Sequence, residues 1–205
     1  MISICVCDPQ PVVREGLRAL LERQERLRLL GACDRPAEAV RMAQRMRPNV
    51  LLIDRGQDFE ELAVTIRGIR NASPQTEVVV WNSEMDDAES FRAIQAGARA
   101  ALSKTADADE VVECLEAAAR KEIWTESLRH LQDARLDRPR HRPLTSRERE
   151  IAALVSNGLK NREIAETLGI ATGTVKIHLM HIFEKTGLRD RYELALCGLQ
   201  SEQAS

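Results

Sequence analysis

Residues 144–195 read LTSREREIAALVSNGLKNREIAETLGIATGTVKIHLMHIFEKTGLRDRYELA. We expect four short helices here, because apolar residues recur at helical spacing and glycines follow the first two runs. Thr145 precedes Glu148 by three residues, which is the spacing of a capping box at a helix start. The second helix is expected over Asn161–Leu168 and the third over Thr174–Lys185. Two helices joined by a tight, glycine-containing turn form a helix-turn-helix unit.

The third expected helix has two different faces. One is an apolar stripe with core spacing, made of Val175, Leu179 and Ile182. Another side combines a cation with apolar side chains, namely Lys176, Ile177 and Met180. In a DNA major groove, lysine can reach guanine acceptors and apolar groups can contact the thymine methyl. The pattern therefore favours a DNA-reading helix, and the alternative is a small helical domain whose exposed face binds nothing.

The motifs LTSRERE, GLKNREIAETLGI, TVKIHL and KTGLRDR follow one another almost without gaps. In this order they resemble the LuxR-type DNA-binding domain of the NarL/FixJ response regulators. The resemblance implies that residues 174–185 form the recognition helix, with Lys176, Ile177 and Met180 facing the groove. It places Lys160, Asn161, Thr172 and Thr174 at phosphate-contacting positions. His178 and His181 are expected near DNA phosphates or packed on the helix.

The last helix, expected over residues 191–200, resembles the dimerisation helix of the same family. Leu194, Cys197 and Leu199 lie on it, and the same residues also suit an ordinary core. One short helix reads too few bases for useful specificity, so we expect a homodimer on paired half-sites of double-stranded DNA.

Length and composition indicate a two-domain protein of 205 residues with a net charge of −2. Residues 138–205 hold 11 Lys and Arg against 8 Asp and Glu, so the C-terminal part is basic and the rest is acidic. We find no transmembrane run and no signal segment, and we expect a cytoplasmic protein without membrane contact. The five cysteines lack zinc-like paired spacing, which favours reduced thiols.

Residues 1–122 alternate short apolar runs with helical patterns, which predicts a parallel sheet covered by helices. Five such repeats point to an α/β flavodoxin-like (βα)5 domain. The expected strands are residues 2–6, 28–32, 50–53, 77–81 and 100–102. The expected domains are therefore 1–122, a linker at 123–143 and a small all-α four-helix domain at 144–205. Prolines and charges in residues 135–143 suit a solvated tether.

Ionisable residues follow three of the predicted strands. Asp8 follows the first strand, Asp54 the third and Lys104 the fifth. Ligand sites of such sheets form at the carboxyl ends of the strands, so we expect these side chains to meet in one pocket. Two carboxylates and one ammonium suit phosphoryl chemistry with Mg²⁺. A salt-bridged strand rim without chemistry is the alternative.

The segments PVVREGLRALLE and AGARAALSK, with the strand end at Asp54, resemble a receiver domain of the response regulators. The resemblance implies that Asp54 is the phosphoacceptor, that Asp8 and Asp54 hold Mg²⁺, and that Lys104 completes the pocket. Several positions depart from the family pattern. Pro9 stands where receivers carry a second acid. Asn82, with Ser83 beside it, stands where they carry the switch hydroxyl, and Ala101 stands where they carry the switch aromatic. Residues 57–62 lack the usual loop sequence.

These departures lead to the hypothesis that the receiver has lost ordinary phosphorylation control, although Asp58 offers a partial substitute for the missing acid. We therefore predict a sequence-specific DNA-binding transcription regulator that needs no cofactor, with Mg²⁺ doubtful. The alternatives are a phosphorylation-activated regulator that has a partner sensor kinase, a regulator controlled by an unknown ligand at the receiver, and a protein-interaction module with vestigial DNA binding. An enzyme is disfavoured, because no nucleophile–base pair, glycine-rich phosphate loop or metal cluster is present.

Overall fold

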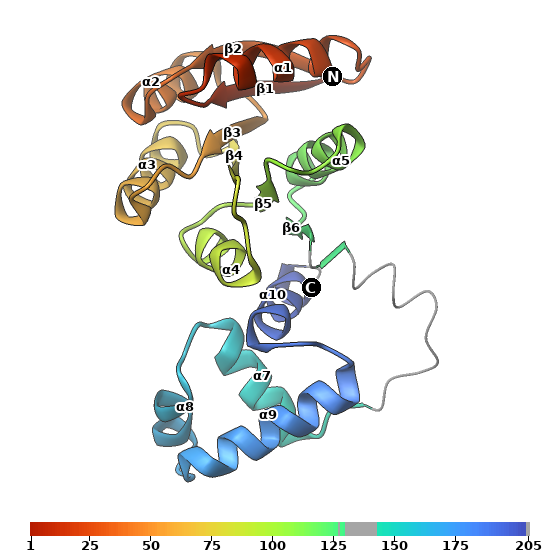
Figure 1. Ribbon diagram of the computed structural model, residues 1–205. Coiled ribbons are helices and arrows are strands. Elements are labelled where there is room, and N and C mark those ends of the chain that lie inside the picture. The colour runs from red at the N-terminus through yellow and green to blue at the C-terminus, as the bar shows by residue number, and fades with distance from the viewer. Residues whose placement is uncertain (127, 130–142, 204–205) are drawn as a thin grey trace. The chain divides into compact units, whose positions relative to one another are not determined.

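The computed structural model describes residues 1–126, 128–129 and 143–203, with the side chains of residues 199–203 left out. The chain divides into two compact units, Met1–Glu126 and Ser127–Ser205, which are described separately (Figure 1). Residues 130–142 lie outside the described residues, and they include all of the predicted tether (residues 135–143) except Pro143.

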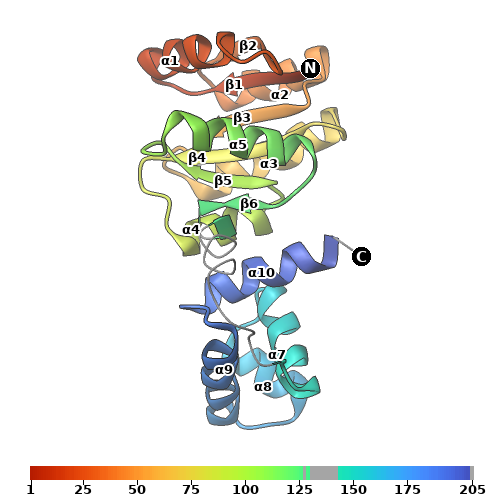
Figure 2. The same cartoon turned by 90° about the vertical axis from the view of Figure 1, so that its right-hand side faces the viewer.

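The first unit contains one parallel sheet with the strand order β2-β1-β3-β4-β5-β6 (Figure 2). Its strands are β1 (Ile2–Cys7), β2 (Leu27–Cys33), β3 (Val50–Asp54), β4 (Glu77–Asn82), β5 (Ala100–Ser103) and β6 (Trp124–Thr125). Its helices are α1 (Pro11–Glu22), α2 (Pro36–Met46), α3 (Phe59–Ala72), α4 (Asp87–Gln95) and α5 (Ala108–Ala119). The predicted α/β class is confirmed, and the first five strands match the predicted ones within one residue at each end.

Helices cover both faces of this sheet, as Figure 1 shows. One apolar cluster joins α1 and α5 to the sheet, and a second joins α2, α3 and α4 to the opposite face. Residues 50–53 of β3 contribute alternately to the two clusters, and all four are buried. This burial on both faces explains why the strand reads as an unbroken apolar run.

Strand β6 was not predicted from the sequence. Its two residues pair in parallel with β5, where Ala100 faces Trp124 and Ala101 faces Thr125. We expected Trp124 within the linker, whereas its side chain is buried in the cluster beneath α5. A strand of two residues is too short to show a period-2 pattern, so its assignment depends on tertiary packing.

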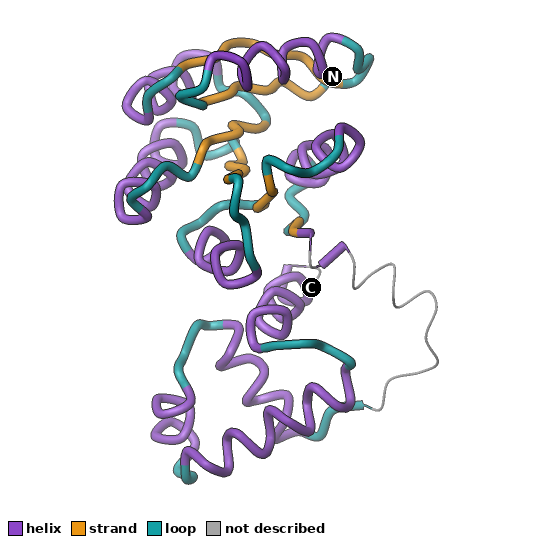
Figure 3. Tube along the Cα trace, in the orientation of Figure 1, coloured by secondary structure: helices purple, strands orange, loops and turns teal. Residues whose placement is uncertain are grey.

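The second unit is helical, as predicted, and Figure 3 distinguishes its helices from its loops. The helices are α7 (Ser146–Ser156), α8 (Asn161–Leu168), α9 (Thr172–Thr186) and α10 (Arg191–Gln203). Thr145 and Glu148 form the expected capping box, and Gly169 ends α8 in a left-handed conformation with φ 64°. The third helix begins two residues earlier than predicted, at Thr172, because Ala171 acts as its N-cap.

Helices α7 and α10 approach each other closely at Gly198. A Cβ atom built at Gly198 would lie 1.9 Å from Ser156 Oγ and 2.9 Å from Ser156 Cβ. Only glycine fits at such a contact without a shift of the backbone. Leu194 is buried within this unit, Cys197 is half-buried, and the side chain of Leu199 lies outside the described atoms.

A buried ion pair connects α7 to α9. Lys185 Nζ lies 2.7 Å from both carboxylate oxygens of Glu148, whose side chain is 4% exposed. The hydrogen bonds from Lys185, followed by the one from the Thr145 backbone, lower the pKa of Glu148 from 4.5 to about 2. The folded unit therefore favours the ionised carboxylate more strongly than the unfolded chain does.

This shift predicts a loss of stability in acid. A depressed pKa stabilises the fold fully above about pH 4.5, and the contribution disappears as the pH falls towards about 2. Thermal unfolding followed by far-UV circular dichroism should show this loss in the wild type and a weaker pH dependence in Glu148→Gln. Glu166→Gln, which removes an exposed partner of Arg162, is the matched control. Equal pH dependence in wild type and Glu148→Gln would contradict the assignment.

Candidate functional site

The carboxyl ends of β1, β3 and β5 bring Asp8, Asp54 and Lys104 together. Lys104 Nζ lies 2.7 Å from Asp8 Oδ2 and 2.6 Å from Asp54 Oδ2. Asp8 is fully buried, and the side chains of Lys104 and Asp54 are 11% and 15% exposed. The sheet topology places these residues, since parallel strands end at the same edge.

Local contacts fix both carboxylates. Asp8 Oδ1 accepts a hydrogen bond from the backbone N–H of Gln10, and Asp54 Oδ1 accepts one from Gly56, each at 2.8 Å. Burial opposes the charge of Lys104, but the hydrogen bonds and charges of the two aspartates outweigh it and raise the pKa of Lys104. The pocket thus holds a charged lysine, which neutralises one of two close carboxylates.

The donor atoms present do not fit a magnesium site as they are arranged. Both Oδ2 atoms contact the Lys104 ammonium, and both Oδ1 atoms accept backbone hydrogen bonds. Pro9 offers no ligand where a second acid would stand, and no group of three metal-ligating side chains occurs among the residues described. Mg²⁺ requires near-octahedral oxygen ligation, so its binding here would require rearrangement.

The structure also places the other three positions at which the sequence departs from the receiver pattern or offers a substitute. The Asn82 amide, at the end of β4, donates to the carbonyl oxygen of Glu84 at 3.3 Å. Ala101 is buried in β5. Asp58 caps α3 by accepting from the Glu60 backbone at 2.8 Å, so its carboxylate has a structural partner.

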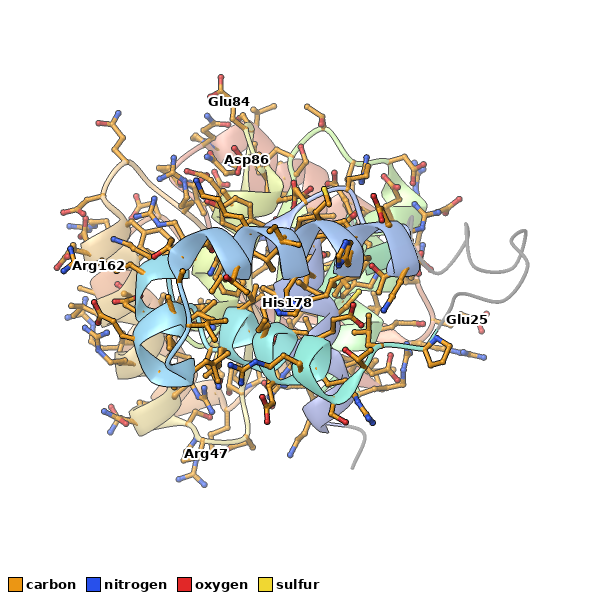
Figure 4. The ribbon with its side chains drawn as sticks, turned by 90° about the horizontal axis from the view of Figure 1, so that it is seen from below. Glu25, Arg47, Glu84, Asp86, Arg162 and His178 are labelled. Atoms are coloured by element: carbon orange, nitrogen blue, oxygen red, sulfur yellow. The ribbon has the colours of Figure 1, made fainter. Side chains whose placement is uncertain are left out.

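The predicted DNA-reading face lies on the exposed side of α9. Ile177 is 53% exposed and Met180 is 51% exposed, and Lys176 is exposed beside them. The core stripe of Val175, Leu179 and Ile182 is buried on the other side, as predicted. Figure 4 draws the side chains of this unit and labels His178 on α9 and Arg162 on α8. The exposed side of α9 therefore combines a cation with two large apolar side chains, as the sequence predicts.

The expected phosphate-contacting residues lie at two helix N-termini. Lys160 is the exposed N-cap of α8, and Thr172 is the exposed first residue of α9, with Thr174 half-buried behind it. Asn161 Oδ1 accepts a hydrogen bond at 2.8 Å from Arg191, which also donates to the carbonyl of Leu159. His181 is exposed on α9. Positive helix N-termini suit phosphate groups.

Two family matches cover both units. Residues 4–116 match the family described as "Response regulator receiver domain", and residues 142–197 match "Bacterial regulatory proteins, luxR family". The chain is a response regulator of the LuxR type. It is a DNA-binding transcription regulator of two-component systems, a family of switches rather than enzymes.

Similar proteins span nearly the whole response regulator. The transcriptional regulatory protein LiaR of Bacillus subtilis (strain 168) is 33% identical, and the match covers 96% of each chain. The response regulator ChrA of a heme-sensing two-component system is 26% identical, with a TM-score of 0.50 and 98% of each chain covered.

RcsB of Salmonella enterica serovar Typhimurium, bound to promoter rprA with phosphomimetic BeF3−, shares the fold at 19% identity. Its TM-score is 0.54, and the match covers 97% of this chain and 100% of that one. A further structure contains two RcsB dimers on two parallel DNAs, with 19% identity, a TM-score of 0.53 and 98% of each chain covered. In the part of this chain that is described, no helix is long and apolar enough to cross a membrane.

Sequence reasoning missed two residues that support the sites. Trp81 packs beside the receiver pocket, with Lys104 Nζ 5.2 Å from the centroid of its ring. Arg191 orients Asn161 from 30 residues away. No local motif identifies either residue, although the register of β3 and β4, which pairs Asp54 with Trp81, makes the first predictable once the sheet order is known.

Proposed function

We propose that this response regulator binds specific DNA sites as a homodimer and does so without ordinary phosphorylation of Asp54. In this proposal Lys176, Ile177 and Met180 contact base edges. Lys160, Asn161, Thr172, Thr174 and His181 contact the phosphates or lie close to them. The exposed apolar pair on α9 supports the base-reading role, since thymine methyl groups are the apolar feature of the major groove.

The arrangement around Asp54 carries the proposal of phosphorylation independence. The Asp54 Oδ2 atom contacts Lys104, Pro9 provides no ligand, and Asp58 is used as a helix cap. A magnesium ion, when bound in a receiver pocket, neutralises charge on the incoming phosphoryl group. Lys104 contacts one oxygen atom of each carboxylate and backbone N–H groups contact the other two, so few oxygen atoms remain free to hold that ion here.

Phosphorylation by a partner sensor kinase is the second candidate. Asp8, Asp54 and Lys104 are the residue types that phosphoryl transfer uses, and they meet at one strand edge. LiaR carries the name of a transcriptional regulatory protein, and the RcsB complex was obtained with a phosphomimetic. The third candidate is a receiver that only binds a partner or a small ligand. For each of the three candidates we propose that the protein acts in the cytoplasm.

The deciding experiment is an intact-mass measurement after incubation with a small phosphodonor and Mg²⁺. We expect no phosphoryl gain in the wild type, together with specific DNA binding by the untreated protein. Pro9→Asp, which restores the second acid at an exposed position, should gain one phosphoryl group. The same gain should be absent from Pro9→Asp/Asp54→Asn.

A wild type that gains one phosphoryl group and loses it in Asp54→Asn would instead establish the kinase-controlled candidate. Untreated protein that binds all DNA fragments equally would favour the interaction module, because specific recognition adds affinity beyond phosphate contacts.

A further inference from the structure

A side chain from α10 holds the first residue of α8 at the start of the helix-turn-helix. Arg191, the first residue of α10, donates a hydrogen bond from Nη1 to Asn161 Oδ1 at 2.8 Å. Its Nη2 atom donates to the backbone carbonyl of Leu159, which precedes α8. One guanidinium therefore joins the N-terminus of α10 to the N-terminus of α8.

The backbone around Arg191 is itself anchored. Asp190 Oδ1 accepts hydrogen bonds from the backbone N–H groups of Tyr192 at 2.8 Å and Glu193 at 3.0 Å, as an N-cap residue does. Leu188 before this cap and Leu194 after it are both buried in the helical unit. The arginine side chain thus starts from a fixed position when it reaches across to α8.

The contact with Arg191 decides which way the Asn161 amide faces. A guanidinium has hydrogen-bond donors and no acceptor, so only the amide oxygen can be its partner. The Nδ2 group, which has two N–H donors, therefore faces away from Arg191. Among the residues that the structure describes, none accepts a hydrogen bond from Nδ2. A DNA phosphate, whose oxygen atoms are acceptors, suits this group.

Other polar groups at the start of α8 have partners within the helix. The backbone N–H of Lys160 donates to Glu163 Oε2 at 2.5 Å. Arg162 pairs with Glu166 at 3.0 Å, and its side chain is 85% exposed. Asn161 differs from them, because the partner that orients its side chain comes from another helix.

We propose that Arg191 is a positioning residue for DNA binding. It holds the Asn161 amide so that the –NH2 group donates to a DNA phosphate, and it does not contact the DNA itself. Without the guanidinium, the amide is able to turn and to present its oxygen, which repels the phosphate. This role rests on the proposed function, in which Asn161 contacts a phosphate, and it adds that α10 takes part in that contact.

The test measures Kd by fluorescence anisotropy for the full-length protein and a cognate site selected from random DNA. The site carries one uncharged methylphosphonate, moved along the backbone from one DNA to the next. The phosphate that Asn161 contacts is the one whose replacement weakens binding by the wild type but not by Asn161→Ala. We expect Arg191→Met to weaken binding to unmodified DNA about 10-fold or more and to be insensitive at that same phosphate. Arg149→Met, the same substitution at an exposed position of α7, should keep the wild-type response.

Two further readouts distinguish positioning from other roles of Arg191. The double variant Asn161→Ala/Arg191→Met should bind no more weakly than Asn161→Ala, because Arg191 acts through Asn161. The slope of log Kd against log salt concentration should be the same in Arg191→Met as in the wild type. Loss of a direct arginine–phosphate contact would instead reduce that slope by about 0.9.

Asn161→Asp tests the orientation of the side chain without removing Arg191. A carboxylate still accepts a hydrogen bond from the guanidinium, so the contact between α8 and α10 is kept. Its second oxygen atom then stands where the –NH2 group stood, and its charge repels the phosphate. We therefore expect Asn161→Asp to bind DNA more weakly than Asn161→Ala. Equal binding by Asn161→Asp and the wild type would overturn the proposal even if Arg191→Met fails to fold.

Other results would also overturn the proposal. If Arg191→Met stays sensitive at the Asn161 phosphate, or if the losses in Asn161→Ala and Arg191→Met add, Arg191 only supports the fold. A reduced salt slope, or insensitivity at a different phosphate, would mean that Arg191 contacts the DNA directly. If Asn161→Ala responds like the wild type at every phosphate, the phosphate contact in the proposed function fails as well. The response of Asn161→Ala thus separates the failure of the proposed function from the failure of the role of Arg191.

Discussion

Lys104→Met should lower the free energy of unfolding of the receiver by about 3–5 kcal/mol, the cost of leaving a buried charge without its partner. The substitution keeps most of the side-chain volume and removes the ammonium that contacts Asp8 and Asp54. Asp8, with no exposed surface, would then remain as an uncompensated carboxylate. Urea unfolding followed by tryptophan fluorescence measures this, because Trp81 and Trp124 both lie in the receiver.

A double variant separates charge from packing. Asp8→Asn removes the buried negative charge and keeps the shape, so Asp8→Asn/Lys104→Met should recover a large part of the stability lost in Lys104→Met. Such non-additivity is expected only for groups in direct contact. If the losses of unfolding free energy in Asp8→Asn and Lys104→Met simply add in the double variant, the ion pair between these residues does not stabilise the receiver.

Lys176→Ala should weaken binding to the cognate site by about 1–3 kcal/mol, or roughly 5- to 150-fold in Kd. Lys176 is exposed beside Ile177 and Met180, so the substitution removes a base-reading group without disturbing the core. The site is first selected from random DNA, and Kd is then measured by fluorescence anisotropy at several salt concentrations. Sequence preference should relax at the base pair that Lys176 reads.

Two controls distinguish base reading from charge. Lys160→Ala, at the N-cap of α8, should weaken binding to all sequences and reduce the salt dependence. Arg67→Ala removes an exposed cation of α3 in the receiver and should change neither. Unchanged sequence preference in Lys176→Ala would mean that another part of α9 reads the bases.

The sequence predicted those helices and strands whose signals lie within a few neighbouring residues. Thr145 and Glu148 fix the start of α7, and the apolar run of β3 marks a buried central strand. It also predicted that Asp8, Asp54 and Lys104 share one edge, because parallel topology alone places strand ends together. It did not predict β6 or the Trp81 contact with Lys104, since both depend on strand neighbours far apart in sequence.

The contact of Arg191 with Asn161 escaped sequence reasoning for the same reason. It joins the first residues of α10 and α8, and it depends on how these helices pack in the folded unit. A separation of 30 residues in the chain contains no sign of this proximity. The exposed face of α9, by contrast, could be predicted from the sequence, because helical periodicity separates the buried apolar stripe of this helix from its outer face.

The contact between Gly198 and Ser156 restricts how this protein can change in evolution. A methyl group at position 198 has no room while a hydroxymethyl group stands at 156. Relatives with alanine at position 198 should therefore carry glycine at position 156, or have a wider spacing between α7 and α10. The two positions are expected to co-vary as a pair, although 41 residues separate them in the chain.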